Sequence, residues 1–297
     1  MCESTKGSDD LSYAYTNVDE AAAWRATIWS TAPWPVNETP AFVELRGFDL
    51  KMVAIDMLHC FHLGIGRDLI GSAVKTLVRL RYWPGSSIEK SLAQATLSLR
   101  RWAKQQRLTL ACKSLTKSNI GWDQLYPELR AKGYDCYVVL AWLAEETSSN
   151  RPLGTTALEQ DYLDRICATI WCANSWMSSC SNAGMFLTEH QQEHKTVIGS
   201  HYVNLYIGLA GQALAEKKKM WRVRPKFHLF HHRVIENRPS RLNPVATATW
   251  MDEDWIKRTM KVKKMTHKRK ATVNSLRRWI LALPDKLAEA LDKLDRR

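Results

Sequence analysis

Apolar residues recur every three or four positions along most of the chain, which is the spacing of a helix with one buried face. One such face, in the segment 65–80, consists of Ile65, Leu69, Ala73, Leu77 and Leu80. The same spacing predicts further helices over 86–107, 121–131, 134–146, 157–178, 188–218 and 226–236. We therefore expect a mainly α protein.

Helix starts are marked by side chains that accept hydrogen bonds from the first free amides of a helix. Two capping-box patterns, in which Glu or Gln follows Ser or Thr by three positions, occur at Ser86 with Glu89 and at Thr188 with Gln191. Thr249 opens another predicted helix, and the helical pattern continues to residue 283. A short helix is also predicted early in the chain, over 19–31.

An extended pattern is confined to residues 41–55. Phe42, Val43 and Leu45 belong to one candidate strand, and residues 51–55 form another. These boundaries divide the chain into an arm with a short helix (1–40), a short strand region (41–63), a helical domain (64–218) and a basic helical region (219–297). We expect the helical domain to form a bundle-like body.

The net charge of +13 arises from the last part of the 297-residue chain. Residues 1–215 carry 20 Lys and Arg against 21 Asp and Glu, whereas residues 216–297 carry 23 against 9, a net charge of +14. A concentration of one sign of charge predicts an acidic partner. Nucleic acid is the commonest such partner, and an anionic membrane surface is the alternative.

The run from Lys257 to Arg278 holds ten basic residues and no acidic one. In a helix, four of its lysines share one stripe, and phosphate contacts would neutralise that stripe. The predicted nucleic-acid-binding residues are these four, Lys257, Lys261, Lys264 and Lys268, together with Arg269, Arg277 and Arg278. The same run, KVKKMTHKRK, has the character of a nuclear import signal.

The first residues, MCESTKGSDD, lack the apolar stretch of a secretory signal. The longest uncharged stretch, 166–188, is too polar to span a bilayer. Seven cysteines, an odd number with no C-x-x-C spacing, favour reduced thiols. We expect a nuclear or cytoplasmic protein that is not secreted and has no membrane partner.

Asp56 follows a short apolar run and precedes His59 and His62, and this pattern has two interpretations. One is a carboxylate that binds a divalent metal at the end of a strand. The other is a helix start, with Asp56 as the cap and the two histidines one turn apart on one face. A later set of histidines is predicted to be solvated on a helix, because the H-E-x-x-H pattern is absent. These later histidines are His190, His194 and His201.

Three segments resemble motifs of cut-and-paste DNA transposases of the CACTA and Plavaka/KDZ type. DMLHCFHLGIGRDLI (56–70) resembles their D-x-(M/L)-H-x-x-x-L-G motif, and RPKFHLFHH (224–232) resembles their P-K-x-H-x-x-x-H segment. TWMDEDWIKR (249–258) is similar to the segment beyond these, which holds a family glutamate. The order of the segments and the long helical spacer agree with the family, and the resemblance covers roughly residues 30–265.

The resemblance implies an RNase H-like α/β core, incomplete here, with a helical insertion domain as the body of the chain. In that family three carboxylates hold two divalent ions, Mg²⁺ or Mn²⁺, for attack on a phosphodiester. Asp56 would match the second aspartate and Glu253 the glutamate, with Asp252 and Asp254 as its close competitors. His59 would be a further metal ligand. No carboxylate before Asp56 lies in a suitable strand pattern, so the first aspartate is missing.

The first functional hypothesis is a truncated, transposase-derived protein that binds nucleic acid, DNA in preference to RNA, without cutting it. The second is a helical protein–protein interaction module whose basic tail is a nuclear-targeting signal. The third is a divalent-metal-dependent DNA nuclease that uses Asp56, Glu253 and a third carboxylate. A homo-oligomer is compatible with all three.

Overall fold

The structure is a computed structural model of the chain. It describes residues 2–4, 11–28, 36–235 and 241–250, together with the single positions 30, 32, 34, 256, 260 and 277. Contacts divide the chain into two compact units, residues 1–248 and residues 249–297. The helices predicted beyond residue 250 lie almost wholly outside the described residues.

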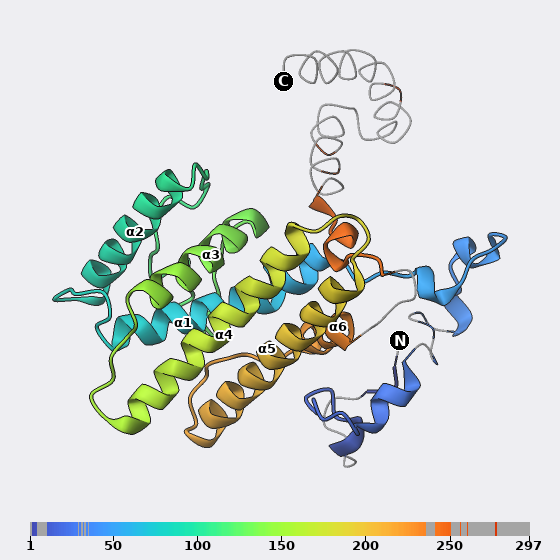
Figure 1. Ribbon diagram of the computed structural model, residues 1–297, viewed down its shortest axis with the longest axis horizontal. Helices are drawn as coiled ribbons and strands as arrows, with labels where there is room; N and C mark the ends of the chain where they lie inside the picture. The colour runs from blue at the N-terminus through green and yellow to red at the C-terminus, as the bar shows by residue number, and fades with distance from the viewer. Residues whose placement is uncertain are drawn as a thin grey trace. The chain divides into compact units, whose positions relative to one another are not determined.

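The described part of the first unit is mainly α, as the apolar spacing predicts (Figure 1). Its helices are α1 (Gly66–Arg79), α2 (Ile88–Gln105), α3 (Gly133–Ser149), α4 (Ala157–Ser181), α5 (Glu189–Ala215) and α6 (Pro225–Ile235). Each lies within a few residues of a predicted range, and a π-helical turn, Leu58–Ile65, leads directly into α1. The helix predicted at 19–31 is reduced to a 3₁₀ turn, Ala23–Thr27. None of the helices in the described ranges combines the length and hydropathy that crossing a bilayer requires.

The core lies between the long helices. α4 packs along α5 and against α3, while α6 packs on α5 and on the π-helical turn (Figure 1). The ring of Phe230 in α6 lies 4.8 Å from Trp176 in α4 and 5.4 Å from Tyr202 in α5, centroid to centroid. Phe61 of the π-helical turn completes this cluster, 5.3 Å from Phe230. All four side chains are fully buried, and burial of each phenylalanine contributes roughly 1.5–3 kcal/mol of transfer free energy.

Helix starts follow the capping patterns, with one shift of register. Thr188 and Gln191 form the predicted capping box of α5, with the Gln191 amide donating to Thr188 Oγ1 over 3.2 Å and the Thr188 amide to Gln191 Oε1 over 2.9 Å. α2 is capped one residue later than predicted, because Ser87 and not Ser86 accepts the amide of Lys90. Both caps pair amides that a helix N-terminus otherwise leaves free.

The strands predicted within 41–55 are wrong. This region forms 3₁₀ turns instead, Ala41–Glu44 and Leu50–Met52. Its apolar side chains pack locally, with the Phe42 ring 5.3 Å from that of Phe48 and 5.6 Å from that of Trp34. A strand needs a neighbour to pair its amides, and no strand occurs among the described residues of the chain. The RNase H-like sheet that the resemblance implies is therefore not found in the described residues.

The helix predicted at 121–131 is also wrong, because backbone groups of this segment bond to other parts of the chain. The Leu129 amide donates to the Arg67 carbonyl at the start of α1 over 2.9 Å. Gly71 permits this close approach to α1, since a Cβ atom there would lie 2.5 Å from the backbone of Glu128. Tertiary contacts thus override the local helical spacing.

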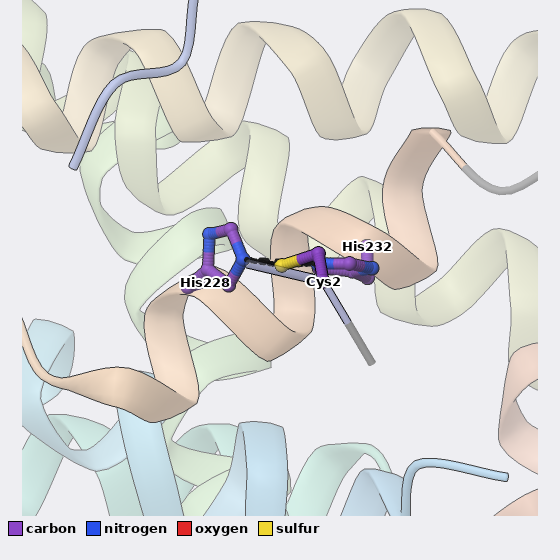
Figure 2. A group of neighbouring side chains, drawn as sticks. All are labelled: Cys2, His228 and His232. Atoms are coloured by element: carbon purple, nitrogen blue, oxygen red, sulfur yellow. Dashed lines mark hydrogen bonds between the residues drawn. The ribbon is translucent and has the colours of Figure 1, made fainter. Parts of the chain in front are cut away.

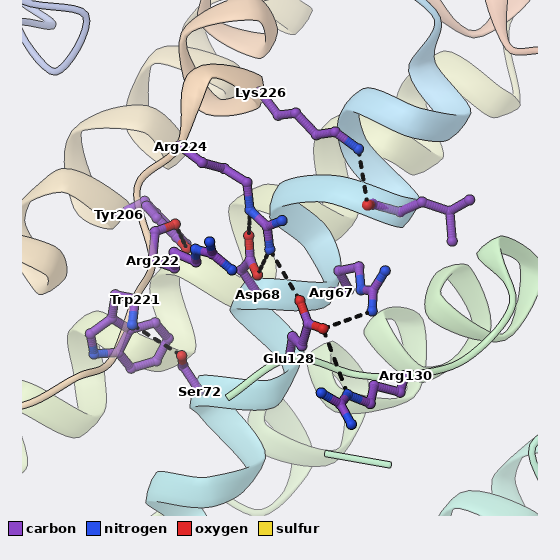
Figure 3. A network of polar contacts seen from close by, with 11 residues as sticks. Arg67, Asp68, Ser72, Glu128, Arg130, Tyr206, Trp221, Arg222, Arg224 and Lys226 are labelled. Carbon is purple, nitrogen blue, oxygen red and sulfur yellow. Dashed lines mark hydrogen bonds and ion pairs between the residues drawn. The ribbon is translucent and has the colours of Figure 1, made fainter. Parts of the chain in front are cut away.

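The segment after α5 returns to α1 and is held there by a buried ion pair (Figure 3). Arg224 donates through Nε to Asp68 Oδ2 over 2.7 Å and through Nη2 to the other oxygen of the same carboxylate. Asp68 is 0 % exposed. Burial raises the pKa of Asp68 to about 6, and the Arg224 guanidinium opposes this shift. The carboxylate is therefore ionised at neutral pH and depends on arginine in place of water.

Three further hydrogen bonds attach the same segment to the helical body (Figure 3). The Trp221 amide donates to Ser72 Oγ of α1 over 3.0 Å. Tyr206 of α5 donates to the carbonyl of Arg222 over 3.0 Å, and Lys226 Nζ donates to the carbonyl of Leu63 over 3.3 Å. Residues 219–226 therefore belong to the helical body in the structure.

Replacing Arg224 by methionine should lower the free energy of unfolding by about 3–5 kcal/mol, because it leaves the Asp68 carboxylate buried without its partner. The double variant Asp68→Leu/Arg224→Met should lose less, since it leaves no unpaired carboxylate in the interior. Urea denaturation followed by circular dichroism measures both losses.

The matched control is Arg151→Met. Arg151 makes the same two bonds to a carboxylate, that of Asp164, but on the exposed surface. Its replacement should leave the unfolding midpoint almost unchanged. A double variant at least as unstable as Arg224→Met would contradict the role assigned to the buried pair.

Candidate functional site

The structure favours the helix-start interpretation of Asp56. Its Oδ1 accepts the amide of Leu58 over 2.9 Å, and its Oδ2 pairs with Nδ1 of His59. Both carboxylate oxygens therefore have partners in the first turn of the π-helical segment, as the oxygens of a capping side chain do.

The described residues do not assemble the predicted magnesium or manganese site. Among them, one group of three metal-ligand side chains has its ligand atoms within 4.8 Å of one another, and it contains neither Asp56 nor His59. Glu253, the second predicted carboxylate, lies outside the described residues. The binding of shared metal ions by Asp56 and Glu253 stays a prediction.

Most of the predicted nucleic-acid contacts also lie outside the described residues. These positions are Lys257, Lys261, Lys264, Lys268, Arg269 and Arg278. Arg277 is described, and it is helical and exposed. Nucleic-acid binding by residues 257–278, which we call the basic tail, therefore stays a prediction from the sequence. The charge on the first unit is a separate observation.

A second basic region lies along the chain from the end of α1 to the loop after α2. Residues 75–117 hold ten Lys and Arg and one acidic residue, a net charge of +9, which the average over residues 1–215 conceals. The acidic residue, Glu89, pairs with Lys117 over 2.5 Å. Of the other nine basic side chains, eight are exposed: Arg79, Arg81, Lys90, Arg100, Arg101, Lys104, Arg107 and Lys113.

α2 lies at the edge of the helical body and has two different faces (Figure 1). Its buried face, with Leu92, Leu99 and Ala103, packs on the neighbouring helices. At helical spacing, four exposed residues share the opposite face, which we call the α2 face: Lys90, Leu97, Arg101 and Lys104. The first and last of these are fourteen positions apart, which corresponds to a length of about 21 Å along the helix.

An open cleft of about 620 Å³ lies in the region that follows α2. Four basic side chains line this basic cleft: Arg67, Lys113, Arg130 and Lys132. Polar groups of Ser114, Thr116 and Asn119 are also in its lining. Arg100 of α2 donates to the carbonyl of Lys113, so the helix and the cleft are directly connected.

The carboxylate in the lining of the cleft is already engaged. Asp135 accepts the amides of Ala111 over 2.8 Å and Cys112 over 3.1 Å, which fixes the loop before α3. Among the described residues, Lys113 and Lys132 form no ion pair. The lining therefore has an excess of positive charge that suits phosphate oxygens.

Glu128 links the basic cleft to the buried ion pair (Figure 3). Its Oε1 accepts from Arg67 over 3.1 Å and lies 3.7 Å from Nε of Arg130. Its Oε2 accepts from Arg224 over 3.2 Å. One carboxylate thus orients two guanidinium groups at the cleft and leaves the set of three arginines with a net positive charge.

The histidines of α5 and α6 have opposite environments. Those of α5 are exposed, as predicted: His190, His194 and His201. Those of α6 are buried, and burial lowers the pKa of His228 and His231 to about 3 and that of His232 to about 4. The imidazoles of α6 are therefore neutral near pH 7. The thiol of Cys2 lies within 3.2 Å of two of them, a proximity that no sequence spacing indicates.

Comparison of the chain with protein-family models, with curated proteins and with solved structures found no match. The transposase resemblance therefore rests on three sequence segments. The functional argument depends on the charge and geometry of the first unit.

His62 links stability to pH. Burial lowers the pKa of His62 from 6.5 to about 4, with Asp56 opposing the shift. The unfolded chain therefore binds this proton at a higher pH than the folded chain does. Its contribution is fully present above pH 6.5 and is lost as the pH falls through about 4, by about 1.4 kcal/mol per pH unit at the steepest.

The variant His62→Phe should remove this part of the acid sensitivity, because it keeps a ring against Phe61 and Tyr137 and carries no titrating group. Urea titrations between pH 7 and about 4 measure the slope. His190→Gln, at an exposed position, is the control and should keep the slope of the parent. Parallel curves for the parent and His62→Phe would exclude His62 as a source of the pH dependence.

Proposed function

We propose that the protein binds nucleic acid through the phosphate backbone, with the α2 face and the basic cleft as one contact surface and the basic tail, residues 257–278, as another. The observation that carries the proposal is the set of eight exposed basic side chains within residues 75–117, where the one acidic residue, Glu89, is already paired with Lys117. Basic side chains held this close repel one another, and phosphates relieve that repulsion.

The size of the surface matches a short stretch of duplex. The α2 face is about 21 Å long, and one DNA strand advances about 3.4 Å per nucleotide, so the face spans about six base-pair steps. Lysine and arginine contacts to phosphates position a protein without reading base identity. The proposed binding by this surface is therefore largely independent of sequence.

The origin and the chemistry of the protein are part of the same proposal. On this view the chain is a relative of the CACTA and Plavaka/KDZ transposases and prefers DNA to RNA, both of which rest on the resemblance. It acts in the nucleus, which rests on the basic run KVKKMTHKRK. The capping role of Asp56 supports binding without cleavage.

Apolar surface favours a second candidate, a protein–protein interaction module. Leu153, in the loop before α4, and Leu158, in the first turn of α4, are 80 % and 72 % exposed. They lie outside the α2 face and the basic cleft, so a protein partner would use a different surface. This candidate would be supported if a protein partner bound with an affinity that does not change with salt concentration and that is lost in Leu153→Ser/Leu158→Ser.

Replacing Arg101 and Lys104 by glutamine should weaken binding to duplex DNA and change its salt dependence. With about six phosphate contacts, the parent should show a slope of log association constant against log salt of about −5, and the variant a slope shallower by about 2. Fluorescence anisotropy of a labelled duplex, titrated with the full-length protein at several salt concentrations, gives both slopes.

A charge-matched control is Arg46→Gln/Arg151→Gln, which removes two exposed cations outside the α2 face and the basic cleft. It should keep the slope of the parent. The quadruple variant with glutamine at Lys257, Lys261, Lys264 and Lys268 measures the share of the tail separately. Binding that ignores salt, or a control that loses as much as Arg101→Gln/Lys104→Gln, would contradict the proposal.

The full-length protein should neither cleave nor join DNA strands in Mg²⁺ or Mn²⁺. Two-metal chemistry needs carboxylates that bridge and flank the ions, and Asp56 serves as a helix cap instead. The assay incubates labelled duplex and single-stranded DNA with each metal, beside Asp56→Asn. Metal-dependent cleavage that disappears in Asp56→Asn would establish the nuclease hypothesis in place of this one.

A further inference from the structure

Two histidines of α6 lie next to a cysteine from the start of the chain (Figure 2). Cys2 Sγ lies 3.0 Å from Nε2 of His228 and 3.2 Å from Nε2 of His232. The two Nε2 atoms are 2.9 Å apart, because the histidines lie one helical turn apart on the same face of α6. All three atoms are ligand types that transition metals bind.

Hydrogen bonding alone does not explain this geometry. An imidazole Nε2 has one in-plane position, which either carries a proton or accepts one. Nε2 of His228 nevertheless has three neighbours at bonding distance: Cys2 Sγ, His232 Nε2 and, at 2.8 Å, Ser4 Oγ. One proton or one lone pair satisfies one of these neighbours. A cation placed between the ligand atoms would be bound by the lone pairs of all of them at once.

The spacing and chemistry of the ligands fit zinc. Zinc–nitrogen bonds of about 2.0–2.1 Å and a zinc–sulfur bond of about 2.3 Å place tetrahedral ligand atoms roughly 3.3–3.6 Å apart. The observed separations of 2.9–3.2 Å need a small outward movement to reach these values. One thiolate with two imidazoles favours zinc over magnesium or calcium, which prefer oxygen ligands.

The surroundings pack against the imidazoles and limit their contact with water. His228 and His232 are 5 % and 8 % exposed. The buried ring of Trp24 lies 4.4 Å from the ring of His228 and 5.2 Å from that of His232. Trp24 is itself anchored by a 2.9 Å bond from Nε1 to the carbonyl of Asn17. An apolar wall of this kind limits solvent access to a metal.

We propose that Cys2, His228 and His232 bind one zinc(II) ion. On binding, the Cys2 thiol releases its proton to solvent as the zinc–sulfur bond forms, and the two imidazoles bind through their neutral lone pairs. The fourth tetrahedral position is taken by the Ser4 hydroxyl or by water. The ion fastens the arm that carries Cys2 to α6, across a sequence separation of 226 residues. This site is independent of the proposed nucleic-acid surface.

Cobalt(II) binding tests the site, because a thiolate ligand gives a near-ultraviolet charge-transfer band and tetrahedral coordination gives intense visible bands. The metal-stripped full-length protein should bind one equivalent of Co²⁺ with both signatures, and Zn²⁺ should displace it. Cys2→Ser should lose the charge-transfer band, and His232→Gln the tetrahedral visible bands. Far-ultraviolet circular dichroism verifies that each variant keeps its helices.

Two controls match the chemistry of the ligands elsewhere in the chain. His190→Gln/His194→Gln removes the other histidine pair with a spacing of four, which is exposed on α5. Cys167→Ser removes a free thiol of α4. Both controls should bind Co²⁺ as the parent does. A parent that binds no Co²⁺, or a charge-transfer band that survives Cys2→Ser, would overturn the proposal.

Discussion

The buried ion pair of Asp68 and Arg224 holds the segment between α5 and α6 against α1. A carboxylate that water does not reach needs a cation and good hydrogen bonds to remain ionised, and Arg224 provides two bonds to it. This contact brings the start of α6 against α1 and the π-helical turn. Glu128 accepts from Arg224 with one oxygen and from Arg67 with the other. The ion pair therefore also helps to position the Arg67 side chain that lines the basic cleft.

The helices were predictable because their information is local. Apolar spacing and the capping box of Thr188 and Gln191 require only neighbours within a turn. Two of the wrong predictions, strands within 41–55 and a helix at 121–131, concern segments whose structure depends on backbone partners. For 121–131 these partners are distant in sequence, and for 41–55 no pairing strand occurs among the described residues. The buried ion pair joins residues 156 apart, a relation that no periodicity encodes.

The candidate sites were less predictable than the fold, for two physical reasons. The basic region at 75–117 is present in the sequence, but acidic residues elsewhere in 1–215 cancel its charge when net charge is summed over that whole range. Only a sum over a shorter stretch of the chain reveals it. The convergence of Cys2 on α6 depends on where the arm lies in space, and no ligand spacing marks it. The helix-start interpretation of Asp56, one of the two that the sequence allows, in contrast depends on local geometry and is the one that the structure favours.

The central claim is that phosphates contact the α2 face and the basic cleft. Lysine acetylation with and without duplex DNA, read by mass spectrometry on the full-length protein, tests this claim residue by residue. The exposed Lys104 and Lys113 should lose reactivity when DNA is bound, as should lysines of the basic tail. Protection confined to lysines beyond residue 249, with Lys104 and Lys113 as reactive as in the free protein, would contradict the claim.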